Sequence, residues 1–170
     1  MFILGIDPGT AITGYGIIEQ RGNSLKAKTY GCIRTDSKLP LEARLAVLYE
    51  KLSNEVIGSN SLSCVAVEEL FFNKNTRTAM AVGQARGVIL LAAAHKGIPV
   101  AEYTPLQVKQ GLVGFGRATK SQVQEMVRII LGLREIPRPD DVADALGLAI
   151  CHAHSSSFEK LISVREDSHL

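Results

Sequence analysis

The chain has 170 residues, of which 46% are hydrophobic and 21% are charged, values that exclude a large two-domain machine and a disordered chain and that fit one folded domain. Its net charge of +2 is the sum of two opposite charges. Residues 73–138 carry ten Lys or Arg and three Asp or Glu, for a charge of +7. The rest of the chain carries nine Lys or Arg and fourteen Asp or Glu, for a charge of −5. A basic middle between acid-bearing ends suits a protein that attracts a polyanion and keeps a few carboxylates for metal or proton chemistry. Solvated helix faces give the same pattern, so the charge alone does not decide.

The N-terminal part of the chain has the patterns of four strands and one helix. Residues 2–6 are a continuous apolar run closed by Asp-Pro-Gly, which predicts a buried strand and a sharp turn. Residues 13–19 and 26–34 flank a polar Gly-Asn-Ser and predict a hairpin. Apolar residues at helical spacing predict a helix over 40–57, and a second apolar run over 62–67 predicts a strand that ends in two acids.

Helical patterns dominate the rest of the chain. Residues 76–95 predict a long helix with Gly97 as its C-terminal stop. The segments after it predict, in chain order, a strand over 99–103, a helix over 105–110, a helix that begins after the capping box of Thr119, and a last helix from about residue 140 to residue 153. We therefore predict one α/β domain over residues 1–155, with a mixed sheet covered by helices on both faces, and a weakly held tail over residues 156–170.

Cysteine usage and hydropathy indicate the compartment. Cys32, Cys64 and Cys151 lie far apart with no Cys-x-x-Cys pair, which argues against a disulfide framework and a zinc ribbon. The first apolar run lacks the basic region of a signal peptide, and the longest apolar stretch, 87–94, is far shorter than the roughly 20 residues that span a bilayer. We therefore expect reduced thiols, no membrane segment and a cytoplasmic protein.

Two of the predicted strands end in a carboxylate. Asp7 ends the first strand and Glu68 the fourth, and an acid at the carboxyl end of a central strand points into the crevice where α/β sheets bind their ligands. Because neighbouring strand residues point to opposite faces, Glu68 and Glu69 cannot both share the crevice with Asp7, and we assign Glu68 to it. An Asp-Pro-Gly turn and a pair of solvated strand-end acids are the simpler explanations of these residues.

Three aspartates open the last predicted helix. Asp141 and Asp144 share one face of it, and Asp140 also comes close to Asp144. Capping and the helix dipole explain an acid at Asp140 or Asp141, but Asp144 lies one turn inside the helix among apolar residues. Together with the two strand-end acids, these residues make an all-oxygen site suited to Mg²⁺ or Mn²⁺, and two such ions about 4 Å apart could drive phosphodiester hydrolysis. The pattern favours a nuclease.

The basic middle supplies candidate DNA contacts. Five bases lie in predicted loops or at helix starts, where side chains reach phosphates: Lys74, Arg77, Lys109, Arg117 and Lys120. Phe71 and Phe72 stand side by side in a polar loop soon after Glu68, in a chain that has no Trp. We interpret them as a wedge or stacking platform for unpaired bases, and the simpler alternative is that one of them packs into the core.

The ordered blocks of this chain resemble those of the RuvC family of Holliday-junction endonucleases. The resemblance covers residue 3 to about residue 154. Its blocks are residues 3–9, 13–16, 31–35, Glu68 with Phe71 and 73–75, and residues 83–87, 107–110, 120–124 and 141–146. It implies a ribonuclease-H-like fold, in which helices cover both faces of a mixed five-stranded sheet.

The resemblance also implies roles for individual residues. The family's four acidic catalytic positions bind two Mg²⁺ per subunit, with Mn²⁺ able to substitute, and they are matched here by Asp7, Glu68, Asp141 and Asp144. Phe71 matches an aromatic residue that acts at the junction centre. Lys109 and Lys120 match basic residues that are needed near the scissile strand.

The activity implied by the resemblance is the resolution of four-way DNA junctions in homologous recombination and DNA repair. A homodimer nicks two strands of like polarity at symmetric positions by two-metal-ion hydrolysis and leaves 5′-phosphate and 3′-hydroxyl ends. Twofold symmetry explains why a dimer suits a four-way junction. Family members work with the RuvA and RuvB branch-migration proteins, which we therefore expect as partners.

Two other protein classes and one other metal site compete with this interpretation. The glycine-rich segment 7–16 also resembles the phosphate loop of actin-like ATPases and sugar kinases, but those enzymes close two such domains over a nucleotide and this chain has the length for one. A non-catalytic junction-binding scaffold would need the basic surface and the dimer but not four converging acids. His152 and His154 beside Cys151 suggest zinc, although residues two apart on a helix face different sides.

Overall fold

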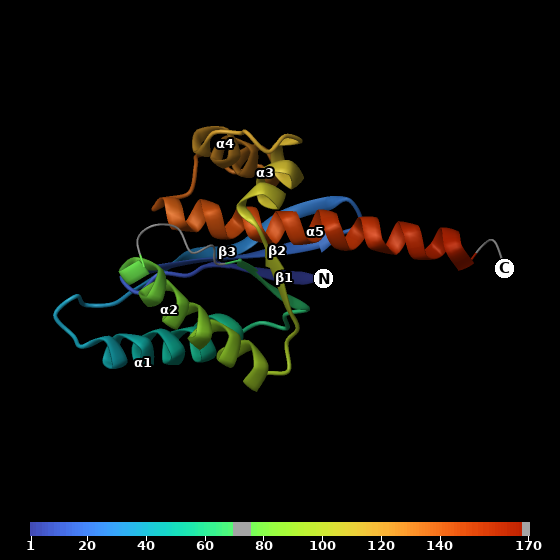
Figure 1. Ribbon diagram of the computed structural model, residues 1–170. Coiled ribbons are helices and arrows are strands. Elements are labelled where there is room, and N and C mark those ends of the chain that lie inside the picture. The colour runs from blue at the N-terminus through green and yellow to red at the C-terminus, as the bar shows by residue number, and fades with distance from the viewer. Residues whose placement is uncertain (70–75, 168–170) are drawn as a thin grey trace.

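The computed structural model describes the backbone of residues 1–69 and 76–167 and the side chains of residues 1–69 and 79–156. Its centre is a five-stranded mixed sheet with the strand order β3-β2-β1-β4-β5 (Figure 1). The strands are β1 (Phe2–Asp7), β2 (Ile12–Arg21), β3 (Ser24–Arg34), β4 (Cys64–Glu68) and β5 (Val100–Tyr103). β1, β2 and β3 form an antiparallel meander, whereas β4 and β5 run parallel to β1.

Helices cover both faces of the sheet (Figure 1). They are α1 (Leu41–Lys51) with its π-helical continuation η1 (Leu52–Ile57), α2 (Thr76–His95), α3 (Pro105–Val113), α4 (Lys120–Leu131) and α5 (Asp140–Asp167). α1 and α2 lie on one face, α5 lies along the other face against β1 and β2, and α3 and α4 pack on the outer side of α5. The predicted mixed sheet with helices on both faces is confirmed.

Each face of the sheet has its own hydrophobic core. Alternate residues of β1 point to opposite faces, so Ile3 packs with Leu146 of α5, whereas Leu4 and Ile6 pack with Ile89 of α2. All five of these side chains are fully buried. A continuous apolar run was the expected signature of such a doubly covered strand, and β1 confirms it.

α5 approaches the sheet very closely where β1 and β2 carry glycine. A Cβ atom on Gly5 would collide with the backbone carbonyl of Ala145, and one on Gly14 would collide with the backbone carbonyl of Asp141. The missing side chains therefore let the first two turns of α5 lie directly on the strands. This contact sets the height of the helix above the carboxyl end of β1.

We expect Gly5→Ala to destabilise the fold by about 3 kcal/mol, because the added methyl group meets backbone that cannot move aside as a side chain could. Gly147→Ala in α5 is the matched control, since a Cβ there would make only ordinary contacts of 3.4 Å or more. It should be neutral or stabilise the helix by up to about 1 kcal/mol. Urea unfolding of both variants measures the difference. Equal free energies of unfolding for Gly5→Ala and the parent would contradict the close seating of α5.

Several helix boundaries differ from the predicted ones. The helix predicted over 40–57 is divided into α1 and η1, and α3 continues to Val113, where Gly114 with φ of 86° caps it. α5 does not end near residue 153 but continues to Asp167. The serines at positions 155–157 follow the predicted end of the helix, but no Gly or Pro follows Gly147 in the sequence, so no strong helix breaker stands there. The domain limit at residue 155 and the weakly held tail stay predictions.

The prediction of no membrane segment can be compared with the described helices. None of those in the described part of the chain combines the length and the apolar character needed to cross a bilayer.

Candidate active site

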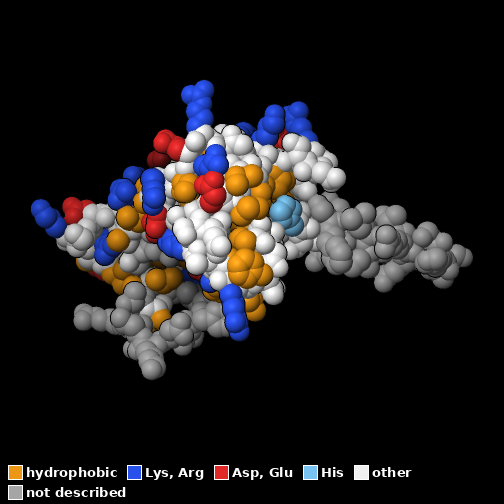
Figure 2. Space-filling view, turned by 90° about the horizontal axis from the view of Figure 1, so that it is seen from above, with side chains coloured by type: hydrophobic (Ala, Val, Ile, Leu, Met, Phe, Trp, Pro, Cys, Tyr) orange, Lys and Arg blue, Asp and Glu red, His pale blue; other side chains and the backbone are white. Residues whose placement is uncertain are grey.

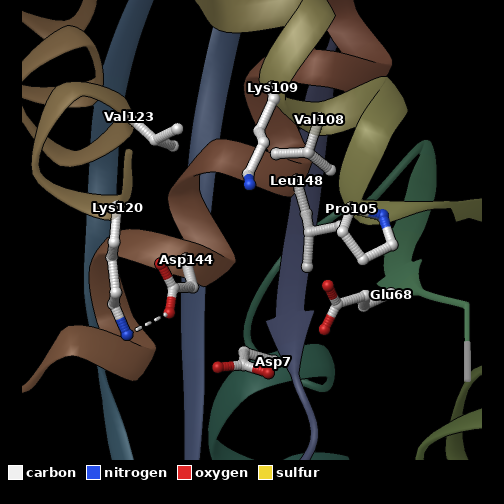
Figure 3. A pocket seen from close by; sticks show the side chains of 9 residues that line it. All are labelled: Asp7, Glu68, Pro105, Val108, Lys109, Lys120, Val123, Asp144 and Leu148. Atoms are coloured by element: carbon white, nitrogen blue, oxygen red, sulfur yellow. Dashed lines mark ion pairs between the residues drawn. The ribbon is translucent and has the colours of Figure 1, made fainter. Parts of the chain in front are cut away.

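A pocket of about 220 Å³ opens at the carboxyl ends of β1 and β4, beneath α3, α4 and α5 (Figure 3). Three carboxylates point toward one another across it, and two lysines reach it from α3 and α4. Its lining consists of Asp7, Glu68, Asp144, Lys109, Lys120, Pro105, Val108, Val123 and Leu148. The pocket therefore combines a carboxylate floor with a basic rim and an apolar wall.

Strand alternation places two of the carboxylates. In the parallel ladder, Gly5 of β1 is opposite Ala66 of β4, and both face α5. Two residues further along each strand, Asp7 and Glu68 therefore point to the same face. Glu69 is exposed instead, which agrees with the choice of Glu68 over Glu69 as the crevice residue.

The first turns of α5 supply the remaining carboxylates. Asp144 lines the pocket, but Asp141 is not among the residues that line it. The backbone and Cβ of Asp141 lie against Gly14 of β2. Its charge still acts on the pocket, because it helps to raise the pKa values of Asp7 and Asp144. Of the four acids that the sequence singled out, the structure thus brings three into one cavity and places the fourth beside it.

Burial and like charge raise the pKa values of the pocket carboxylates. Burial, followed by the charges of Asp144, Glu68 and Asp141, raises the pKa of Asp7 to about 8. Burial and then Asp144 raise the pKa of Glu68, and burial is also the main cause of the raised pKa of Asp144. Lys120 opposes all three shifts without cancelling them. The site therefore holds more potential negative charge than this lysine neutralises.

Lys120 lines the pocket because it is the first residue of α4. Thr119 forms a complete capping box with Gln122, so the helix begins at Lys120. The Lys120 Nζ lies 3.0 Å from Oδ2 of Asp144. Burial alone would lower the pKa of Lys120, but the hydrogen bonds and charges of Asp144 and Asp140 outweigh burial and raise it. Lys120 is thus a protonated cation at the pocket.

The donor set of the pocket fits a divalent cation. As the side chains are placed, no three His, Cys, Asp or Glu side chains of the described residues are grouped to hold a metal ion, and the Lys120 ammonium is the cation that contacts Asp144. However, Asp7, Glu68 and Asp144 offer only carboxylate oxygens, the ligands preferred by Mg²⁺ and Mn²⁺. Burial is the largest cause of their raised pKa values and neighbouring carboxylates add to it, and a bound cation would offset both effects.

The rival zinc cluster near the middle of α5 is absent from the described residues. The Nδ1 of His152 pairs with the Tyr103 hydroxyl at 2.8 Å, and the Nδ1 of His154 lies 3.0 Å from the Gly111 carbonyl oxygen. Cys151 is buried, and burial raises the pKa of its thiol to about 11, which disfavours the thiolate that zinc requires. These side chains serve helix packing.

The predicted DNA contacts are described in part. Lys109 and Lys120 line the pocket, and Arg117 is exposed in the connection between α3 and α4. Figure 2 looks onto this side of the molecule, where Lys and Arg side chains project at several places around a band of hydrophobic ones. The predicted contacts Phe71, Phe72 and Lys74 and the side chain of Arg77 lie outside the described residues.

Sequence reasoning missed two kinds of residue at this site. The first is the apolar wall, for which the sequence predicted no role and which includes Pro105, Val108 and Leu148. The second is Asp140, which forms an ion pair with Lys120. The two residues are twenty positions apart and meet only because α4 packs beside α5. No local pattern could have indicated either.

The fold and the pocket together define a protein with a ribonuclease-H-like fold and acidic strand ends. The family model described as "Crossover junction endodeoxyribonuclease RuvC" matches residues 3–152. The chain therefore belongs to the RuvC family of crossover junction endodeoxyribonucleases.

Individual relatives are similar over nearly their whole length. The RuvC of Desulforamulus reducens is 63% identical over 157 residues, which cover 92% of this chain and 96% of that protein. The RuvC of Desulfitobacterium hafniense is 62% identical over 155 residues, which cover 91% and 93%. The solved structure of Thermus thermophilus RuvC in complex with Holliday junction substrate has a TM-score of 0.85 and 36% identity, and the match covers 93% of this chain and 96% of that one.

Proposed function

We propose that this protein is a metal-dependent, structure-selective endonuclease that resolves Holliday junctions in homologous recombination and DNA repair. The observation that carries the proposal is the pocket in which Asp7, Glu68 and Asp144 converge beneath Lys109 and Lys120. Membership of the RuvC family supports it, and a relative 36% identical to this chain has been solved with Holliday junction substrate.

The proposed chemistry is hydrolysis of a phosphodiester. Asp7, Glu68 and Asp144, with Asp141 beside them, would hold two Mg²⁺ or Mn²⁺ ions, which supply activation of water and stabilisation of the leaving oxygen. Lys109 and Lys120 bind the phosphate and offset the charge that develops on it. Water attacks phosphorus, the bond to the 3′ oxygen breaks, and that oxygen takes up a proton. The products are a 5′-phosphate and a 3′-hydroxyl.

We propose that further basic and aromatic residues select the junction. We propose that Arg117, Lys74 and Arg77 bind backbone phosphates, because bases on loops and at helix starts reach them without reading sequence. Phe71 and Phe72 are proposed to contact unpaired bases at the junction centre. Partnership with RuvA and RuvB and a cytoplasmic location are proposals that rest on family membership.

Two symmetric nicks require two pockets, so the proposal includes a homodimer. Exposed residues at helical spacing along α2 support an interface there: Met80, Gln84, Gly87, Leu91 and Ala94, none of which is charged. Met80 is 64% exposed and Leu91 is 49% exposed, and a Cβ on Gly87 would meet open space. A 20-residue helix is about 30 Å long, which is enough to pair with the same helix of a second copy about a twofold axis.

We expect Leu91→Glu to raise the dimer dissociation constant at least tenfold, because it places one charge from each copy in the centre of an apolar contact (roughly the effect of losing an interface hot spot). Ile129→Glu on α4 is the matched control, since Ile129 is equally apolar and 55% exposed. Sedimentation velocity over a dilution series measures both. A parent chain that is monomeric throughout would contradict the homodimer, and an unchanged Leu91→Glu dimer would contradict its placement on α2.

The direct test of the function is cleavage of a synthetic four-way junction with a mobile homologous core. The assay compares Mg²⁺, Mn²⁺ and a chelator, and maps the nicks on all four strands. Paired symmetric nicks in strands of like polarity, with ends that a ligase can seal, are the expected result with metal. Binding without nicking in either metal would show that the protein is a junction-binding scaffold.

A further inference from the structure

Lys120 joins one acid inside the pocket to one acid outside it. Its Nζ lies 3.0 Å from Oδ2 of Asp144 and 3.3 Å from Oδ2 of Asp140. Asp144 lines the pocket, whereas Asp140, one turn earlier on α5, is not among the lining residues. The lysine side chain is itself 56% exposed, so without these two anions its flexible stem would be free to leave the pocket.

Asp140 is oriented for this contact by a second cation. Arg138, in the connection before α5, pairs with Oδ1 of Asp140 and leaves Oδ2 for Lys120. The two oxygens thus tie the start of α4 and the connection before α5 to the first turn of α5.

The inner partner of Lys120 has another task in the proposed reaction. Asp144 would be a cation ligand there, and a carboxylate that is shared with a divalent ion holds an ammonium less strongly because the ion repels it. Asp7 and Glu68 face Lys120 across the pocket and would be ligands as well. Asp140 lies outside the pocket and would not be shared with a metal ion, so its negative charge still attracts Lys120.

We propose that Asp140 is a positioning residue that keeps the Lys120 ammonium at the rim of the carboxylate pocket when Asp144 is engaged by a metal ion, so that Lys120 meets the scissile phosphate. This inference rests on the proposed nuclease function. It gives Asp140, the acid that directly precedes Asp141, a role of its own. Asp140 acts through Lys120 and does not contact the substrate.

The test is Asp140→Asn, which keeps the shape of the side chain and removes its charge. We expect single-turnover junction cleavage in Mg²⁺ to fall about tenfold, while the junction dissociation constant in chelator stays the same or becomes smaller, since a negative charge near DNA is lost. A residue that acts only through surface charge would give tighter binding with equal or faster cleavage, and that result would overturn the proposal. Asp140→Glu should recover most of the rate, and Glu135→Gln, which removes a charge from the neighbouring connection, is the matched control.

Two further measurements separate this inference from the proposed function. In a Lys120→Met background, Asp140→Asn should have little additional effect on cleavage, because both changes remove the same contact. Without DNA, the side-chain ¹⁵N NMR signal of Lys120 in the Mg²⁺-loaded protein should be ordered in the parent and averaged toward solvent values in Asp140→Asn. An unchanged signal would overturn the role of Asp140 even if cleavage proved the nuclease. A parent that never nicks would overturn the nuclease and leave the NMR comparison to decide whether Asp140 holds Lys120.

Discussion

Asp7→Asn should lower junction cleavage by about a thousandfold while leaving junction binding within about threefold of the parent, since the lost group acts on the developing charge and the basic contacts remain. Asp7 lies at the end of the central strand, between the pocket carboxylates of β4 and α5. The amide has the same shape but lacks the charge that a divalent cation needs. The effect should therefore fall on the chemical step.

The measurement compares single-turnover nicking in Mg²⁺ with junction binding in chelator. Asp36→Asn is the matched control, because it makes the same chemical change at an exposed loop residue that accepts a hydrogen bond from the Lys38 backbone. It should cleave at the parent rate. If Asp7→Asn cleaves as fast as Asp36→Asn, the pocket is not the site of catalysis, whatever the family of the chain.

The strand-end acids were predictable because their placement depends on local geometry. Residues two apart on a strand share a face, so Asp7 points to the same face as Gly5, and Glu68 to the same face as Ala66. Alternation predicted that only one of Glu68 and Glu69 faces Asp7, but the strand register that decides between them comes from the structure. The predicted mixed sheet followed from the same patterns, since a continuous apolar run indicates a strand covered on both faces. These inferences needed no knowledge of how the helices pack.

Features that depend on packing between distant segments were not predictable. Asp141 lies against Gly14 because the helix touches the sheet backbone at that point, and the sequence gives no measure of that distance. The pairing of Lys120 with Asp140 requires α4 to lie beside α5. The length of α5 was missed for a different reason. The serines at positions 155–157 weaken a helix only slightly, and the continuation of the helix to Asp167 depends on the absence of a strong stop.

The crowded carboxylates should also make the metal-free protein less stable as the pH rises from about 4 to about 8. The pKa of Asp7 is about 8 in the folded chain against the ordinary 3.8, with burial as the largest cause. Between these values the folded state binds more protons than the unfolded state, so the free energy of unfolding falls with increasing pH. Above the folded pKa the loss is complete. The raised pKa values of Glu68 and Asp144 act in the same direction.

Asp7→Asn removes the largest of these penalties. In chelator at pH 8 the variant should be more stable than the parent, by on the order of 4 kcal/mol, and the difference should shrink toward zero as the pH approaches 4. Urea unfolding of both proteins at several pH values measures it, and saturating Mg²⁺ should narrow the gap by stabilising the parent. A difference that does not change with pH would mean that Asp7 ionises normally and that the pocket is not strained by its own charge. The catalytic loss and the stability gain have one cause, because a site that buries and crowds its own carboxylates gains free energy when a cation binds there.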